Sequence, residues 1–297
     1  MTTWRDDLHG LQVDDVAKLD RALGIRLGRE DLVHALIDPR GPMFQRLEYV
    51  GDSILDAVVV RELVRLEAWD ETSLALINGE QQAMVSDRAL GRVAARRALP
   101  AVRTFSASKH RLADRIEASI GALWVDRGID DAATAAYELV VRPAVAGIPP
   151  RHELPEAPRS ARYESAAREL GHEPVETVWF GAAALAGPTR RRLAVVGDSV
   201  IETAMSTAQF VEEPDASEAD LSEERRGATS NATLAHRAHE LGLEGRHDDL
   251  DDRRAMADEV QALVGAATLD GGLRAGLVVA SGVLRRRFAP GPLPFDA

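Results

Sequence analysis

The chain has 297 residues, enough for about two domains that fold without metal or disulfide staples, and its 45% apolar content is typical of a globular protein. It has no cysteine, which excludes disulfides, thiolate catalysis and cysteine zinc sites. A net charge of -12 argues against nucleic-acid binding by bulk electrostatics, although local arginine clusters remain compatible with phosphate binding. No stretch reaches the roughly 20 uncharged apolar residues of a membrane span, and no secretion signal is visible, so we expect a cytoplasmic protein without a membrane partner.

The elements of the first half follow helical periodicity. Asp31 precedes LVHALI and Ser86 precedes RALGRVAARRA, and both residue types favour helix N-caps, while Gly24 favours a helix end. Between and after them, residues 46–59 (RLEYVGDSILDAVV) and 111–126 repeat apolar side chains every three to four residues. Strand patterns are poor. We therefore predict an all-α fold.

Two helical blocks each begin their apolar stripe with a pair of carboxylates. Glu48 and Asp52 are four residues apart, and Asp114 and Glu117 are three apart, so each pair shares one helix face. An isolated acidic pair of this kind usually marks a solvated helix face. Because both pairs lead into core-facing rows, we instead expect the two helices to pack together and their carboxylates to meet.

Gly51 and Gly121 lie within these two helices and would allow their backbones to approach closely. Like charges about 4 Å apart repel by roughly 1 to 4 kcal/mol per pair, so a cation or bound protons must offset the repulsion. Oxygen ligands without His or Cys favour Mg²⁺ or Mn²⁺ over zinc. Such a site is suited to the hydrolysis of phosphodiesters.

Proline is concentrated in PAVAGIPPRHELPEAPRS, which predicts a linker near the middle of the chain. Three blocks of the first half recur in the second at offsets of 146, 144 and 144 residues: RLEYVGDSI as RLAVVGDSV, SDRALGRVAARRALP as SNATLAHRAHELGLE, and RLADRIEASIGALWVD as AMADEVQALVGAATLD. The halves are therefore two copies of one unit. We predict a first domain at 1–145, a linker at 146–160, a second domain at 161–288 and a flexible tail at 289–297.

QRLEYVGDSILD resembles the signature stretch of the ribonuclease III family, and LADRIEASIGALWVD is similar to that family's second acidic motif. The resemblance covers most of residues 15–140 and, more weakly, 163–285. It implies all-helical endonuclease domains that act on double-stranded RNA as a twofold dimer with Mg²⁺. Two tandem domains are then expected to form an intramolecular pseudo-twofold dimer. The resemblance assigns metal-binding and catalytic roles to Glu48, Asp52, Asp114 and Glu117.

The second half departs from the family pattern at two of the same four positions. Its equivalents are Ala194, Asp198, Asp258 and Gln261, and neither Ala nor Gln supplies a charged oxygen. We predict a degenerate site there. An alternative is that Asp198 and Asp258 still hold one ion with additional waters.

Other residues are weaker candidates for RNA contacts. The set comprises Gln45, at a position where the family usually has Glu, together with Arg46, Arg97 and Lys109. The resemblance is to the nuclease domain alone, and we expect no double-stranded RNA-binding domain after residue 285. Duplex contacts are therefore expected from the nuclease surface, by shape and by 2′-hydroxyl and phosphate contacts.

These features favour a Mg²⁺-dependent endoribonuclease (a ribonuclease III-type hydrolase) for RNA processing. With one intact carboxylate set, it is expected to nick one strand of double-stranded or structured RNA, leaving a 3′-hydroxyl and a 5′-phosphate as the family implies. The alternative is a noncatalytic RNA-binding or ribosome-associated scaffold that keeps the fold. The sequence leaves open which RNA is bound and whether the pseudo-dimer associates further.

Overall fold

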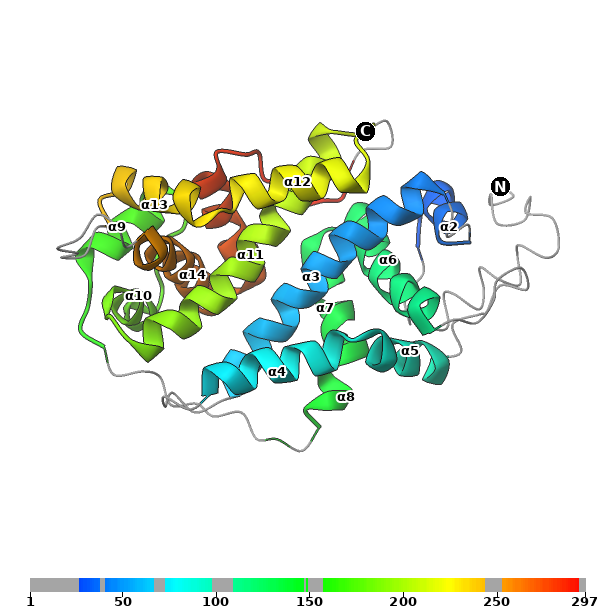
Figure 1. Cartoon of the computed structure of the whole chain (residues 1–297), viewed down its shortest axis with the longest axis horizontal. Coiled ribbons are helices and arrows are strands. Elements are labelled where there is room, and N and C mark those ends of the chain that lie inside the picture. The colour runs from blue at the N-terminus through cyan, green and yellow to red at the C-terminus, as the bar shows by residue number, and fades with distance from the viewer. Residues whose placement is uncertain are drawn as a thin grey trace. The chain divides into compact units, whose positions relative to one another are not determined.

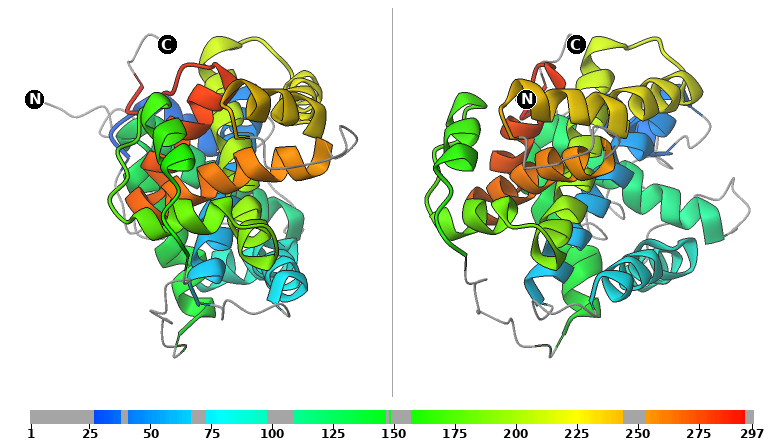
Figure 2. Two further views of the ribbon diagram at one scale, coloured as in Figure 1. Left: turned by 90° about the vertical axis from the view of Figure 1, so that its left-hand side faces the viewer. Right: turned by 60° about the vertical axis from the view of Figure 1, so that its left-hand side comes forward.

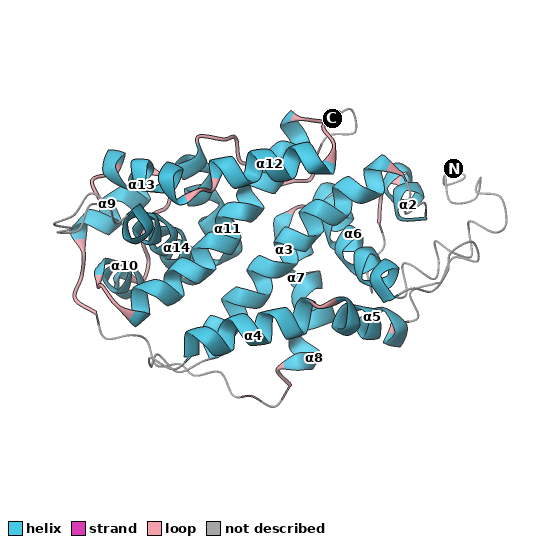
Figure 3. Cartoon of the chain, viewed as in Figure 1, coloured by secondary structure: helices cyan, strands magenta, loops and turns pink. Residues whose placement is uncertain are grey.

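The computed structural model describes residues 27–37, 41–66, 73–97, 109–146, 148, 157–243 and 253–293. Within these ranges every regular element is a helix, which confirms the all-α prediction (Figure 3). The first half contains α2 (Glu30–Ile37), α3 (Pro42–Leu66), α4 (Ser73–Val85), α5 (Asp87–Arg96), α6 (Lys109–Arg127), α7 (Ile129–Ala136), the π-helix η2 (Tyr137–Val141) and α8 (Arg142–Ala144). The second half contains α9 (Ala161–Glu169), α10 (Thr177–Ala184), α11 (Pro188–Glu212), α12 (Glu218–Ala228), α13 (Asn231–Glu240) and α14 (Arg253–Leu284).

The chain divides into two compact units. The N-terminal unit comprises Met1–Leu55, Gln82–Ala146 and Pro290–Ala297, and the C-terminal unit comprises Asp56–Gln81 and Gly147–Ala289. The placement of Asp56–Gln81 in the C-terminal unit differs from a single cut of the chain at the predicted linker. The predicted domain boundaries themselves stay a prediction.

The core of the N-terminal unit lies between the first part of α3 and α6. Leu47, Val50 and Ile54 on α3, with Ile116 and Ile120 on α6, are fully buried. Their spacing of three and four residues is the period of one helix face, so one stripe of each helix is removed from water. α5 packs along α6 in the same unit (Figure 1).

The approach of α3 to α6 requires glycine. A Cβ atom on Gly51 would lie 1.8 Å from the carbonyl oxygen of Glu117, and one on Gly121 would lie 2.1 Å from the carbonyl oxygen of Leu47. No side chain fits at such distances, so the two helices touch backbone to backbone. This contact, which was expected from the sequence, brings the side chains flanking each glycine together.

The C-terminal unit repeats this construction with α11 and α14. A Cβ on Gly197 would lie 1.7 Å from the Gln261 carbonyl oxygen, and one on Gly265 would lie 2.0 Å from the Leu193 carbonyl oxygen. α13 packs on α14, and the golden α13 and orange start of α14 stay adjacent in the turned views of Figure 2. The repeat seen in the sequence is therefore also a repeat of helix packing.

α14 is the principal core helix of the C-terminal unit. By length and composition it could cross a membrane, with a mean hydropathy of 1.4 over its best window, but 61% of that window is buried inside the protein. The helix also breaks at Gly272, whose φ of 83° is left-handed. Burial within the unit accounts for its apolar character, because core helices are apolar on most faces.

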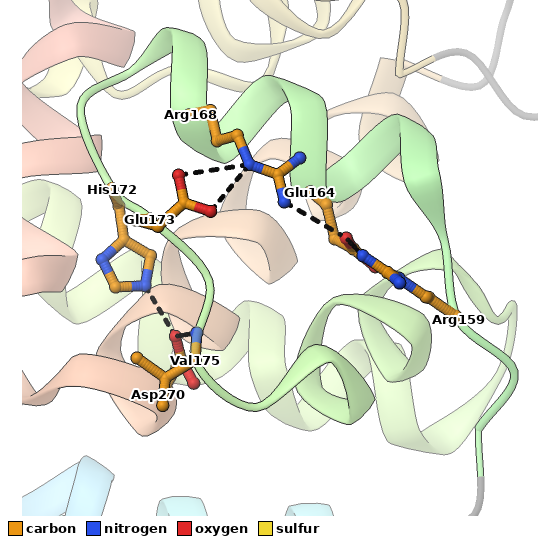
Figure 4. A network of polar contacts seen from close by, with 7 residues as sticks. All are labelled: Arg159, Glu164, Arg168, His172, Glu173, Val175 and Asp270. Carbon is orange, nitrogen blue, oxygen red and sulfur yellow. Dashed lines mark hydrogen bonds and ion pairs between the residues drawn. The ribbon is translucent and has the colours of Figure 1, made fainter.

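A carboxylate fixes an incoming loop at the same point of each repeat. In the N-terminal unit, Asp126 accepts a hydrogen bond from the backbone N–H of Gly28 at 2.9 Å. In the C-terminal unit, Asp270 accepts from the N–H of Val175 at 2.9 Å and lies 2.7 Å from His172 Nε2 (Figure 4). Asp126 and Asp270 are 144 residues apart, so this contact belongs to the duplicated framework.

The predicted N-cap at Ser86 is confirmed, because its hydroxyl accepts a hydrogen bond from the Ala89 N–H at 3.4 Å. Its equivalent, Ser230, accepts from the Thr233 N–H at 3.3 Å. Each serine satisfies a backbone donor that the first helical turn leaves without a partner. The second block of the repeat therefore begins in the same way in both units.

The predicted N-cap at Asp31 is wrong. α2 begins one residue earlier, at Glu30, and the Asp31 carboxylate instead accepts hydrogen bonds from Arg29 at 2.5 and 3.1 Å. A strong cation two residues away competes with the backbone for this carboxylate. Gly24, predicted to end a helix, lies outside the described residues.

Part of the segment predicted as a flexible tail is held in place. Pro290 accepts a hydrogen bond through its carbonyl from Ile129 N–H at 2.9 Å, and Leu293 donates its N–H to the Val125 carbonyl at 2.9 Å. These bonds attach residues 290–293 to the turn between α6 and α7, which corrects the prediction for these residues. Residues 294–297, like most of the predicted linker, lie outside the described residues.

Candidate active site

Three of the four predicted carboxylates converge in the N-terminal unit. Glu48 comes from α3, and Asp114 and Glu117 come from α6. One oxygen of each lies within 4.8 Å of the others, and all three side chains are half-buried. The backbone contact at Gly51 brings the two helices close enough for this convergence.

The fourth predicted carboxylate, Asp52, lies close enough to act electrostatically on the same group. Burial raises the pKa of Glu117 to about 9, with further contributions from the negative charges of Asp52, Glu48 and Asp114 in that order. A carboxyl with so high a pKa holds a proton at neutral pH unless a cation takes the proton's place. The site therefore has the charge imbalance that a divalent ion corrects.

The donors of this cluster suit a hard divalent cation. They are carboxylate oxygens, the ligand type that Mg²⁺, Mn²⁺ and Ca²⁺ take from proteins, and none is a nitrogen or sulfur. Their half-buried position would leave part of the coordination to water or substrate. We conclude that the cluster is chemically able to hold a metal ion.

The equivalent position in the C-terminal unit is built differently. Gln261 Nε2 donates a 2.6 Å hydrogen bond to Asp198 Oδ1, and Ala194 is buried where α3 carries Glu48. Burial and the charge of Glu202 raise the pKa of Asp198 to about 6, against the lowering effect of the Gln261 hydrogen bond, and Asp258 raises it further. An amide thus occupies the place of a carboxylate, as expected for a degenerate site.

Two acidic residues that act on these sites were not predicted from the sequence. Asp87, at the start of α5, contributes to the raised pKa of Glu117, and Glu202 contributes to that of Asp198. Glu202 follows Asp198 by one helical turn, so the helical period was a usable signal for it. Asp87 is distant in sequence from Glu117, and no local pattern connects them.

The weaker RNA-contact candidates fall in different environments. Gln45 and Arg97 are exposed, and the side chain of Lys109 lies outside the described residues. Arg46 is 7% exposed, and its repeat equivalent, Arg192, is 1% exposed. An arginine buried at both equivalent positions belongs to the packing of the unit, so Arg46 does not have the surface position of a phosphate contact. RNA binding at the other positions stays a prediction.

Two helical units of one construction, with a convergent carboxylate cluster among the described residues of the N-terminal unit, define a tandem all-α protein. Comparison with known families agrees with this class. The family described as Ribonuclease III domain matches residues 45–128 and 191–272, together more than half of the chain. The chain therefore belongs to the ribonuclease III domain family.

Relatives and solved structures extend this assignment. The chain is 34% identical over 113 residues to "Ribonuclease 3" of Thermobifida fusca, covering 35% of this chain and 45% of that protein. It is 33% identical over 114 residues to "Ribonuclease 3" of Nocardia farcinica, covering 34% and 46%. It thus spans less than half the length of these curated relatives. A structure of Giardia Dicer has a TM-score of 0.61 at 15% identity over 84% of this chain and 55% of that chain, which shows a shared fold.

Proposed function

We propose that this chain is a Mg²⁺-dependent endoribonuclease that hydrolyses phosphodiesters in double-stranded or structured RNA, with Mn²⁺ as an alternative ion. The observation that carries the proposal is the convergence of Glu48, Asp114 and Glu117 in the N-terminal unit. Membership of the ribonuclease III domain family and the name of the curated relatives support the same reaction class. We also propose that the protein acts in the cytoplasm.

Glu48, Asp52, Asp114 and Glu117 would hold the metal. The ion would supply an activated water and neutralise charge on the phosphodiester as it is attacked. The protein's part is to position four carboxylates on two helices that Gly51 keeps in backbone contact. Burial around Glu117 limits bulk water at the cluster, which strengthens electrostatic interactions there.

We further propose that the native chain cuts one strand only. The C-terminal unit keeps Asp198 and Asp258 but has Gln261 hydrogen-bonded to Asp198 where the other unit has Glu117. That amide nitrogen satisfies an oxygen that a metal ion would otherwise use. The C-terminal unit would then support the fold and contact RNA without hydrolysing it.

The two units are proposed to pair as an intramolecular pseudo-twofold dimer. Their repeated construction supports this arrangement, and a linker of about 15 residues gives the halves a high effective concentration for each other. Cutting by a chain that sediments as a monomer would agree with the proposal. A rate per chain that falls on dilution would instead show that two chains must associate.

The test uses a duplex RNA labelled separately on each strand, incubated with the native chain and Mg²⁺ or Mn²⁺. The proposal predicts metal-dependent cleavage of one strand at each bound site. No cleavage at any concentration of either ion would favour the alternative, a noncatalytic RNA-binding or ribosome-associated scaffold. Cleavage of both strands would show either that the C-terminal unit is active or that two chains act together.

A further inference from the structure

The outward face of α5 carries three arginines at intervals of one helical turn. Arg88, Arg92 and Arg96 are exposed, whereas Leu90 and Ala94 on the opposite face are fully buried. Steps of four residues advance about 6 Å each, so the three positions span roughly 12 Å of the helix. We call these three residues the arginine track.

The three side chains of the arginine track are exposed. Among the described residues, no carboxylate forms an ion pair with any of the three, and Arg92 Nε donates to the Arg88 carbonyl oxygen at 3.2 Å. Other exposed arginines are held differently: Arg142, for example, pairs with Glu138 at 2.7 Å. Three guanidinium groups without a carboxylate partner in the described part of an acidic protein form a local positive surface.

The track lies on the helix that packs against the second helix of the carboxylate cluster. α5 packs along α6, the helix that carries Asp114 and Glu117 (Figure 1). A polyanion bound along the track would lie on the helix next to the one that carries two acids of the cluster.

The C-terminal unit has neither the arginine row nor the full set of four carboxylates at the equivalent positions. The positions of α13 equivalent to the arginine track, each 144 residues later, are Ala232, His236 and Glu240. Glu240 is occupied locally, because it pairs with Arg237 and with Arg285. The unit that has lost two carboxylates thus also presents no cationic row on the matching helix.

We propose that the arginine track binds consecutive phosphates of one RNA strand and leads that strand into the carboxylate cluster. This inference rests on the proposed function and adds a substrate-positioning surface to it. Arginine forks match phosphate oxygens, and the roughly 12 Å span allows contact with two or three neighbouring phosphates. The track also explains how a chain of charge -12 binds RNA on one defined face.

The test replaces the three residues together, as R88Q/R92Q/R96Q. Glutamine keeps helix propensity at exposed positions and removes only the charge. The matched control is R142Q/R226Q/R274Q, which changes net charge equally at exposed positions outside α5. R88K/R92K/R96K restores the charge. Binding to a short duplex RNA is measured over a range of salt in an Asp52→Asn background, so that the RNA stays intact.

The track variant should bind duplex RNA on the order of 10-fold more weakly than the control. The slope of its log affinity against log salt concentration should be smaller by the amount expected for about two to three lost phosphate contacts. The lysine variant should recover most of the affinity. In the native background, KM should rise while kcat stays within about threefold. Affinity and salt dependence equal to those of the control would contradict RNA binding by the arginine track, and so would a loss confined to kcat. A native chain that cuts no RNA but binds it through the track would contradict the proposed nuclease activity and would still support RNA binding by the track.

Discussion

Gln261 donates a 2.6 Å hydrogen bond to Asp198 in the C-terminal unit, at the position where the N-terminal unit places the carboxylate of Glu117 near Asp52. In one unit an amide donates a hydrogen bond to the aspartate. In the other, acids face each other and require a proton or a cation. The pKa of Glu117 is therefore raised further, to about 9, than that of Asp198, which the Gln261 hydrogen bond holds at about 6.

Restoring the acid in the C-terminal unit should destabilise the metal-free protein. Gln261→Glu removes the hydrogen bond to Asp198 and places a further carboxylate near Glu202 and Asp258. Loss of a buried hydrogen-bond donor costs about 1 to 3 kcal/mol, and like-charge repulsion adds to it. Chemical denaturation in EDTA measures this cost. A denaturation midpoint equal to that of the native chain would contradict the structural role of Gln261.

The stability of the metal-free N-terminal unit should fall as pH rises. The pKa of Glu117 is raised from an ordinary 4.5 to about 9, so its neutral form is favoured in the folded state. The contribution of Glu117 to the free energy of unfolding is complete below about pH 4.5 and is lost as pH rises through about 9. Glu117→Gln should remove this dependence and be more stable than the native chain at pH 8 in EDTA. Unfolding curves across pH 5 to 9 test this, and a native slope that the substitution leaves unchanged would refute it.

The close contact of α3 and α6 should tolerate no side chain. Gly51→Ala places a Cβ 1.8 Å from a backbone oxygen, so the helices must separate, at a cost of about 3 kcal/mol or more. Gly227→Ala is the matched control, because nothing lies within 4 Å of its added Cβ and alanine favours helix by about 1 kcal/mol. Denaturation midpoints compare the two variants. Similar midpoints would mean that the helices do not depend on this contact.

Much of the framework could be predicted because it is local or repeated. Helical periodicity marked α3 and α6, the serine before α5 marked its start, and Gly51 and Gly121 indicated where α3 and α6 touch. The convergence of Glu48, Asp114 and Glu117 followed from those contacts. The helices and the cap are set by residues within one or two helical turns, and the α3–α6 contact was indicated by a glycine in each helix.

The remaining features depend on partners distant in the chain. Nothing near Asp270 reveals that it binds the loop at Val175, which lies 95 residues earlier. The burial of Arg46 and the attachment of residues 290–293 to the α6–α7 turn likewise depend on tertiary packing. For Asp31, a neighbouring arginine outcompeted the helix cap that its residue type favours.

The most direct test of the central claim compares the same substitution in both units. Asp52→Asn and Asp198→Asn change equivalent residues on α3 and α11, in a chain assayed on duplex RNA labelled on each strand. If the N-terminal unit alone hydrolyses RNA, Asp52→Asn should lower single-strand cutting on the order of 100-fold or more, and Asp198→Asn should leave the rate within about threefold. Equal losses from the two substitutions, or cutting that survives Asp52→Asn, would contradict the account.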